Sequence, residues 1–242
     1  MGAMPMPGGA TMPMAAMSSV WVPMAGQTWP AAAASFLAMW MVMMVPMMLP
    51  VLTPTLWQYR QMAAASEGVQ RMFLTGLVGV AYFSVWTVIG LVAFAAGAVL
   101  AGALATAQMH SPEAMRAARV AAGIAVIAAG VFQFTPWKAR ELACCRSMPA
   151  QFAMSSIART SLSADMATAF RHGARLGFHC VRSCAGLTAI LLVTGVMDVR
   201  VMALVATAIT AERLSPPRWR VSQAIGGIAV ATGALLIVRA IA

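Results

Sequence analysis

Long uninterrupted apolar runs are the feature that most constrains how this chain can fold. The run from Met72 to Ala105 contains no charged residue. A helix that crosses a bilayer needs about 20 apolar residues. Inside a membrane every backbone polar group must find a partner, so only helices and closed barrels cross it. The runs lack the alternating pattern of barrel strands. We therefore predict an all-α fold, a polytopic transmembrane helical bundle.

The composition points to the same class. Hydrophobic residues make up 61% of the 242 residues and charged residues only 9%, whereas about 25% is usual in soluble domains. The formal net charge of +10 would suit a nucleic-acid partner, but the cations gather in a few loops between apolar runs. That distribution is typical of membrane topology. We therefore expect a lipid bilayer as the partner and no nucleic acid.

The apolar runs divide the chain into a tail and one membrane domain. Residues 1–33 form a Met-, Gly- and Pro-rich segment that we predict to be a flexible N-terminal tail. Residues 34–242 form a single transmembrane helical domain with about six spans and a basic amphipathic cytoplasmic segment at about 138–175. The expected spans are roughly 34–56, 72–105, 120–135, 176–197, 199–211 and 221–241.

The loops also suggest an orientation. The tail has no Lys or Arg, and alternate loops carry most of the cations. Since cytoplasmic loops are enriched in Lys and Arg, we place the N-terminus outside and the basic segment in the cytoplasm, most simply in a bacterial inner membrane.

The first span carries an unusual density of methionine and proline. Pro46, Pro50 and Pro54 recur every four residues within it. Proline lacks the N–H that a helix interior uses and clashes with the preceding turn, so we predict a kinked helix. Freed carbonyls at membrane depth are tolerated where they face protein or a cavity, which favours a site or path at this point.

Sulfur residues from three parts of the chain are predicted to meet at one depth. Cys180 and Cys184 are spaced by four, so they lie on one face of a helix. Thiolate and thioether ligands select Cu(I), and imidazole also suits copper or zinc. The candidate metal ligands, with copper as the possible cofactor, are Cys180, Cys184, His179, Cys145, Met43, Met47 and Met48.

Packing is the alternative explanation of the same residues. Free Cys behaves as a small hydrophobe, and Met fills irregular gaps in a core. The chain would then be an accessory or structural subunit of a larger membrane complex, with other membrane subunits as partners. A metal-dependent membrane enzyme is a third alternative, although the sequence contains no phosphate-binding loop, no nucleophile elbow with partners and few acidic residues for acid–base chemistry.

Three blocks of the chain resemble the DUF2182 family of integral membrane proteins, which is described as metal-binding. The blocks are Trp40-x-x-Met43-x-x-Pro46-Met47-Met48-Leu49-Pro50-x-x-x-Pro54, Phe132-Gln133-Phe134-Thr135-Pro136-Trp137-Lys138 with Cys145-Arg146-x-x-Pro149, and Gly177-Phe178-His179-Cys180-Val181-Arg182-Ser183-Cys184. The resemblance covers roughly residues 36–242 and implies a soft-metal site. Glu141 and Ser183 stand where the family pattern tends to have cysteines, and Pro46 stands in place of an Ala.

The few acidic residues are expected to pair locally. We predict a local interfacial pair between Glu212 and Arg213, and a pair between Glu141 and the neighbouring Arg140 or Arg146.

Overall fold

A computed structural model describes residue 21 and residues 27–62, 68–106, 112–155, 162–194, 198–215 and 220–241. In these residues all regular secondary structure is helical. The helices are α2 (Trp29–Met62), α3 (Gly68–Thr106), α4 (Pro112–Phe132), α5 (Pro136–Ser155), α6 (Leu162–Thr194), α7 (Val199–Leu214) and α8 (Val221–Ile241). The predicted all-α class is confirmed. Most of the predicted N-terminal tail lies outside the described residues, but its residues 29–33 belong to α2, which begins five residues before the predicted first span.

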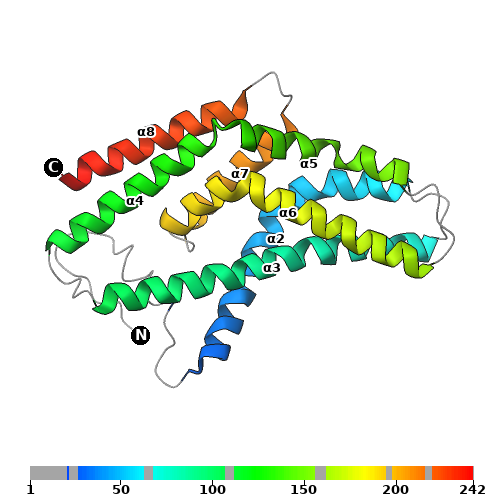
Figure 1. Cartoon of the computed structure of the whole chain (residues 1–242), viewed down its shortest axis with the longest axis horizontal. Coiled ribbons are helices and arrows are strands. Elements are labelled where there is room, and N and C mark those ends of the chain that lie inside the picture. Colours follow the sequence, from blue (N-terminus) through cyan, green and yellow to red (C-terminus); the bar gives the residue numbers. More distant parts are fainter. Residues whose placement is uncertain are drawn as a thin grey trace.

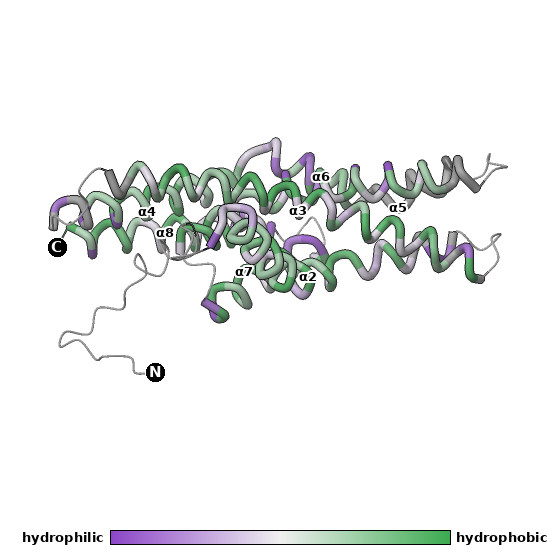
Figure 2. The backbone as a smooth tube through the Cα atoms, turned by 90° about the horizontal axis from the view of Figure 1, so that it is seen from below, coloured by the Kyte–Doolittle hydropathy of each residue, from purple (hydrophilic) through white to green (hydrophobic). Residues whose placement is uncertain are grey.

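Four helices are long and apolar enough to cross a membrane. They comprise Trp29–Trp57, Gly68–Ala103, Met166–Thr194 and Val221–Ile241. A fifth crossing is possible if the bent pair Arg116–Phe132 and Pro136–Cys145 forms one span. Long apolar helices dominate the molecule (Figure 2), as expected of a membrane protein. The described helices thus provide four or five candidate spans rather than the predicted six.

One of the six predicted spans corresponds to α7, which is too short to cross a membrane. Its 16 residues are fewer than the roughly 20 that a crossing needs. Asp198 begins this helix as an N-cap, and its carboxylate accepts from the backbone N–H of Arg200 at 2.8 Å. The segment that we predicted as a fifth span is therefore a short capped helix, and it packs against α2 and α6.

A sharp bend separates α4 from α5. The two helix axes differ by 64° across Gln133–Thr135. The Thr135 hydroxyl accepts from the Lys138 backbone N–H at 3.4 Å, and Pro136 occupies the first helical position, where a missing N–H costs nothing. These local signals end one helix and start the next, and the new direction brings α5 against α6 and α2.

The three prolines of the first apolar run lie inside a single continuous helix, α2. Figure 1 shows α2 changing direction part-way along its length. The rings remove backbone donors that the carbonyls four residues earlier would otherwise use. The first part of α2 is fixed against α3 because Trp40 Nε1 donates to the Trp86 carbonyl at 3.0 Å in the core.

Glycines allow two helix pairs to approach closely. α4 lies beside α8 (Figure 1), and a Cβ on Gly130 would lie 3.0 Å from the Gly226 carbonyl oxygen, while one on Gly123 would lie 3.0 Å from that of Gly233. On the other side of the molecule α6 packs on α3, where a Cβ on Gly177 would lie 2.9 Å from the Tyr82 carbonyl oxygen. Small residues at such crossings are typical of membrane helices.

The α4–α8 contact gives a test of this packing. We expect Gly130→Leu to lower the thermal stability of the protein in detergent, by about 1–3 kcal/mol, because overpacking forces two backbones apart. Gly227→Leu is the matched control, since a Cβ at Gly227 meets nothing within 4 Å. Equal melting temperatures for the two variants would contradict this account of the interface.

Candidate metal site

Two cysteines of α6 form the centre of a buried sulfur cluster. Cys180 and Cys184 are 0% and 2% exposed, and their Sγ atoms are 3.9 Å apart. Neither forms a disulfide. They lie one turn apart on the helix face that points into the bundle, as their spacing predicted.

A methionine of α2 lies beside the cysteine pair. The Met48 Sδ lies 4.0 Å from the Cys180 Sγ, and the Met48 side chain is fully buried. Metal–thiolate bonds are about 2.3 Å long. Two sulfur atoms that bind one metal ion at that length lie at most about 4.6 Å apart, so both distances from the Cys180 Sγ are within the range of sulfurs that share an ion.

Polar groups from two other helices contact the same sulfur. The Tyr82 hydroxyl of α3 donates to the Cys180 Sγ at 3.0 Å. The Arg213 guanidinium of α7 lies within electrostatic range of Cys180. Burial lowers the pKa of Arg213, but the charges of Cys180, Cys145 and Cys184 raise it by more, so its pKa lies above the usual range. A permanent positive charge therefore lies beside the thiols.

Cys145 of α5 reaches the edge of this cluster. It is 2% exposed and lies within electrostatic range of Cys180 and close to the Ser183 hydroxyl. That hydroxyl also donates to the Cys180 backbone carbonyl at 2.9 Å and lies 3.8 Å from the Cys184 Sγ. The structure thus brings together Cys145, Cys180, Cys184 and Met48 among the predicted ligands.

His179 lies apart from this inner cluster. Its Nδ1 is 2.6 Å from Glu141 Oε2, and its Nε2 is 3.9 Å from Cys144 Sγ. The other oxygen of Glu141 accepts from Arg182 at 2.9 Å, and Arg182 stacks over the Trp137 ring at 4.6 Å. Among the described side chains, the ionic partners of Glu141 thus come from α6 rather than from Arg140, and the Arg146 side chain lies outside the described residues.

Met43 and Met47 are placed on a different side of α2 from the contact with Cys180. Both line an apolar groove of about 230 Å³ between α2 and α7, together with Val42, Pro46, Val199, Met202, Ala203 and Ala206. Of the three predicted methionines, Met48 is the one whose sulfur atom contacts Cys180 in the described part of the chain.

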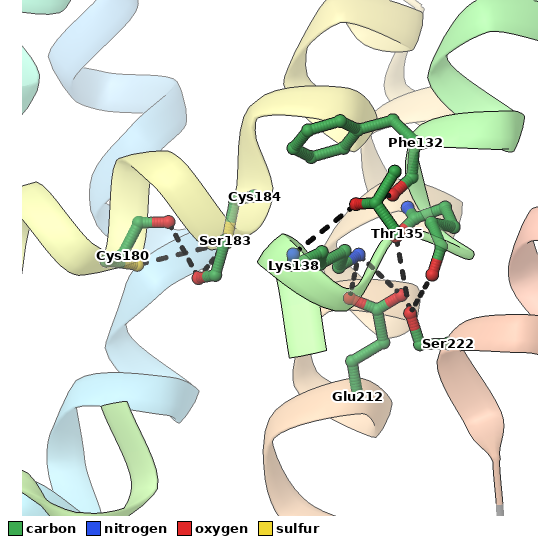
Figure 3. A network of polar contacts seen from close by, with 9 residues as sticks. Phe132, Thr135, Lys138, Cys180, Ser183, Cys184, Glu212 and Ser222 are labelled. Carbon is green, nitrogen blue, oxygen red and sulfur yellow. Dashed lines mark hydrogen bonds and ion pairs between the residues drawn. The ribbon is translucent and has the colours of Figure 1, made fainter. Parts of the chain in front are cut away.

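A buried ion pair lies beside the sulfur cluster. Lys138 of α5 donates to both carboxylate oxygens of Glu212 of α7 at 2.9 and 2.7 Å, and the two side chains are 1% and 3% exposed (Figure 3). Nearby, the Ser222 hydroxyl donates to the Gln133 carbonyl at 3.2 Å. The expected local pair of Glu212 with Arg213 is wrong, because Glu212 faces α5 and Arg213 faces the sulfurs.

Sequence reasoning missed three of these residues. Tyr82 and Arg213 belong to helices without cysteines, α3 and α7, and Lys138 shares α5 with Cys145. The rarity of charged residues in this apolar chain could have indicated Lys138 and Arg213. An ionisable residue inside a membrane protein is a functional candidate by default.

The ligand atoms available in the inner cluster indicate which metal ion it can bind. Among the described residues no group of three or more His, Cys, Asp and Glu side chains could hold a metal ion. A site in the inner cluster therefore requires the Met48 thioether in addition to the two thiols. Thiolate and thioether donors together favour Cu(I).

A comparison with protein families agrees with this chemistry. A family model described as "PpoB2: Copper chaperone" matches residues 37–236. The chain belongs to the PpoB2 copper chaperone family. The match to PpoB2 includes every residue of the inner cluster and of the Glu141–His179 pair. No curated protein and no solved structure matches the chain.

The buried ion pair of this PpoB2 protein gives a stability test. We expect Lys138→Met to lower thermal stability by about 3–5 kcal/mol, because Glu212 is left as an uncompensated buried charge. The double variant Lys138→Met with Glu212→Leu should recover much of the loss, measured by thermal unfolding in detergent. A double variant less stable than Lys138→Met would contradict the pairing.

Proposed function

We propose that the protein is a membrane copper chaperone that binds Cu(I) with Cys180, Cys184 and Met48. The two close sulfur contacts of Cys180 carry the proposal. Their distances of 3.9 Å to the Cys184 Sγ and 4.0 Å to the Met48 Sδ are compatible with sulfurs that share one metal ion at bonds of about 2.3 Å. Family membership and the apolar helices support a membrane protein involved in copper handling.

The charges around the cluster favour a monovalent ion. Two thiolates and one Cu(I) ion carry a net charge of −1, and the neighbouring Arg213 brings the total to zero. A divalent ion in the same place would leave a net positive charge in a buried site, which costs several kcal/mol of desolvation. Cys145 lies at the edge of the cluster, within electrostatic range of Cys180.

The remaining parts of the proposal concern placement. We place the protein in a bacterial inner membrane with its N-terminus outside, on the basis of the loop charges. Met43 and Met47 line the groove beside α7, so we assign them to the path by which copper approaches rather than to the inner cluster. The resemblance to the DUF2182 family remains a prediction from the sequence.

An accessory role in a larger membrane complex is the second candidate. Only 17% of the spanning windows of α3 and α8 is buried, so these helices leave wide apolar faces for lipid or for other subunits. In this alternative the sulfur contacts serve packing. Stoichiometric partners that co-purify with a copper-free protein would support it.

Ligand substitutions separate the two candidates. We expect Cys180→Ala with Cys184→Ala to abolish Cu(I) binding at the inner cluster and Met48→Leu to weaken it by about 10-fold or more, because a ligand is lost while volume is kept. The measurement is competition with the chromogenic Cu(I) chelator bathocuproine disulfonate on purified protein in detergent.

Met44→Leu is the control for packing in this experiment. Met44 is as deeply buried as Met48 and lies one turn earlier on α2. If Met44→Leu and Met48→Leu change the Cu(I) affinity equally, or if the double cysteine variant binds as wild type, the inner cluster is not the copper site.

A further inference from the structure

Two pairs of adjacent residues face opposite sides of the contact between α5 and α6. Cys145 and Cys180 point to the inner sulfur cluster. Their sequence neighbours Cys144 and His179 meet each other instead, with 3.9 Å between Sγ and Nε2. Consecutive helical residues are rotated by about 100°, so one helix pair can present one donor pair inward and another outward.

Glu141 holds the imidazole of His179 in an orientation suited to metal binding. An ionised carboxylate only accepts hydrogen bonds, so the contact of 2.6 Å makes His179 Nδ1 the donor. The lone pair of Nε2 then points toward Cys144. Histidines that ligate metals commonly donate their other ring N–H to a carboxylate, which fixes the tautomer and the ring orientation.

The separation of the two donor atoms fits a shared metal ion. With bonds of about 2.0 Å to nitrogen and 2.3 Å to sulfur, a gap of 3.9 Å corresponds to an S–metal–N angle of roughly 130°. A thiolate and an imidazole are both suitable ligands for copper. The negative charge of Glu141 is compensated by Arg182 at 2.9 Å, so Cu(I) with one thiolate leaves the group neutral.

This outer pair is more accessible than the inner cluster. His179 is 17% exposed and Cys144 is half-buried, whereas Cys180 is fully buried. Two protein ligands also leave coordination positions open for a ligand from outside. An exchange site needs both properties, because an incoming ligand must reach the ion before the first bonds break.

We propose that Cys144 and His179 form a second Cu(I) site through which the ion is exchanged with the inner cluster across the contact between α5 and α6. This inference rests on the proposed function of the inner cluster. Glu141 is a positioning residue in the second site. Binding forms one Cu–S and one Cu–N bond, releases the thiol proton of Cys144 to water and leaves copper as Cu(I) throughout.

Counting bound Cu(I) in full-length variants tests the second site. Wild-type protein in detergent, titrated anaerobically with Cu(I), should bind two ions. Cys144→Ala with His179→Gln should bind one, and Cys180→Ala with Cys184→Ala should also bind one. His172→Gln, two turns earlier on α6, is the control and should bind two.

Exchange rates give an independent readout. The Cys144→Ala, His179→Gln variant should lose its remaining Cu(I) to bathocuproine disulfonate at least about tenfold more slowly than wild type. Glu141→Gln should keep both sites but weaken the outer one by about 10–100-fold, while Glu141→Asp restores part of that affinity.

The outcomes separate this inference from the proposed function. The second site alone is overturned by the following result. Wild type binds a single ion, the Cys144→Ala, His179→Gln variant keeps that ion at an unchanged exchange rate, and the Cys180→Ala, Cys184→Ala variant loses it. Undiminished copper binding in the Cys180→Ala, Cys184→Ala variant overturns the inner site.

Discussion

The sulfur of Cys180 is the atom at which side chains from several helices of the bundle meet. Met48 of α2 and Tyr82 of α3 contact it directly, at 4.0 and 3.0 Å, and Arg213 of α7 lies within electrostatic range of it. The close approach of α6 to α3 at Gly177 makes the tyrosine contact possible. If α6 were rotated by one residue, His179 or Val181 would occupy this place and the three-sulfur arrangement would be lost.

Pairing between helices explains why buried charges are tolerated in such an apolar chain. Lys138 pairs with Glu212, and Glu141 pairs with His179 and Arg182. The first pair joins α5 to α7, and the second group joins α5 to α6. A buried pair contributes little net stability, but it penalises any helix register in which a charge lacks its partner. These ion pairs therefore select the register that gathers the cysteines.

The sequence predicted the helical membrane class and the shared face of Cys180 and Cys184, because both follow from local periodicity. It also predicted that the methionines of the first span lie at the same depth as Cys145 and Cys180. It could not choose Met48 over Met43 and Met47, since that choice depends on the rotation of α2 after its prolines. Adjacent donors such as His179 and Cys180 were assigned to one site for a similar reason: their separation depends on the contact with α5. The partners of Glu212 and Glu141 lie on distant helices, so local pairing rules failed.

The most direct test of the central claim is X-ray absorption at the copper edge of the Cys144→Ala, His179→Gln variant loaded with one equivalent of Cu(I). This variant isolates the inner cluster. We expect the first coordination shell of the copper ion to contain about three sulfur atoms at close to 2.3 Å. The number should fall to two in a variant that also carries Met48→Leu. A shell dominated by nitrogen or oxygen, or a sulfur count unchanged by Met48→Leu, would contradict a copper site built from Cys180, Cys184 and Met48.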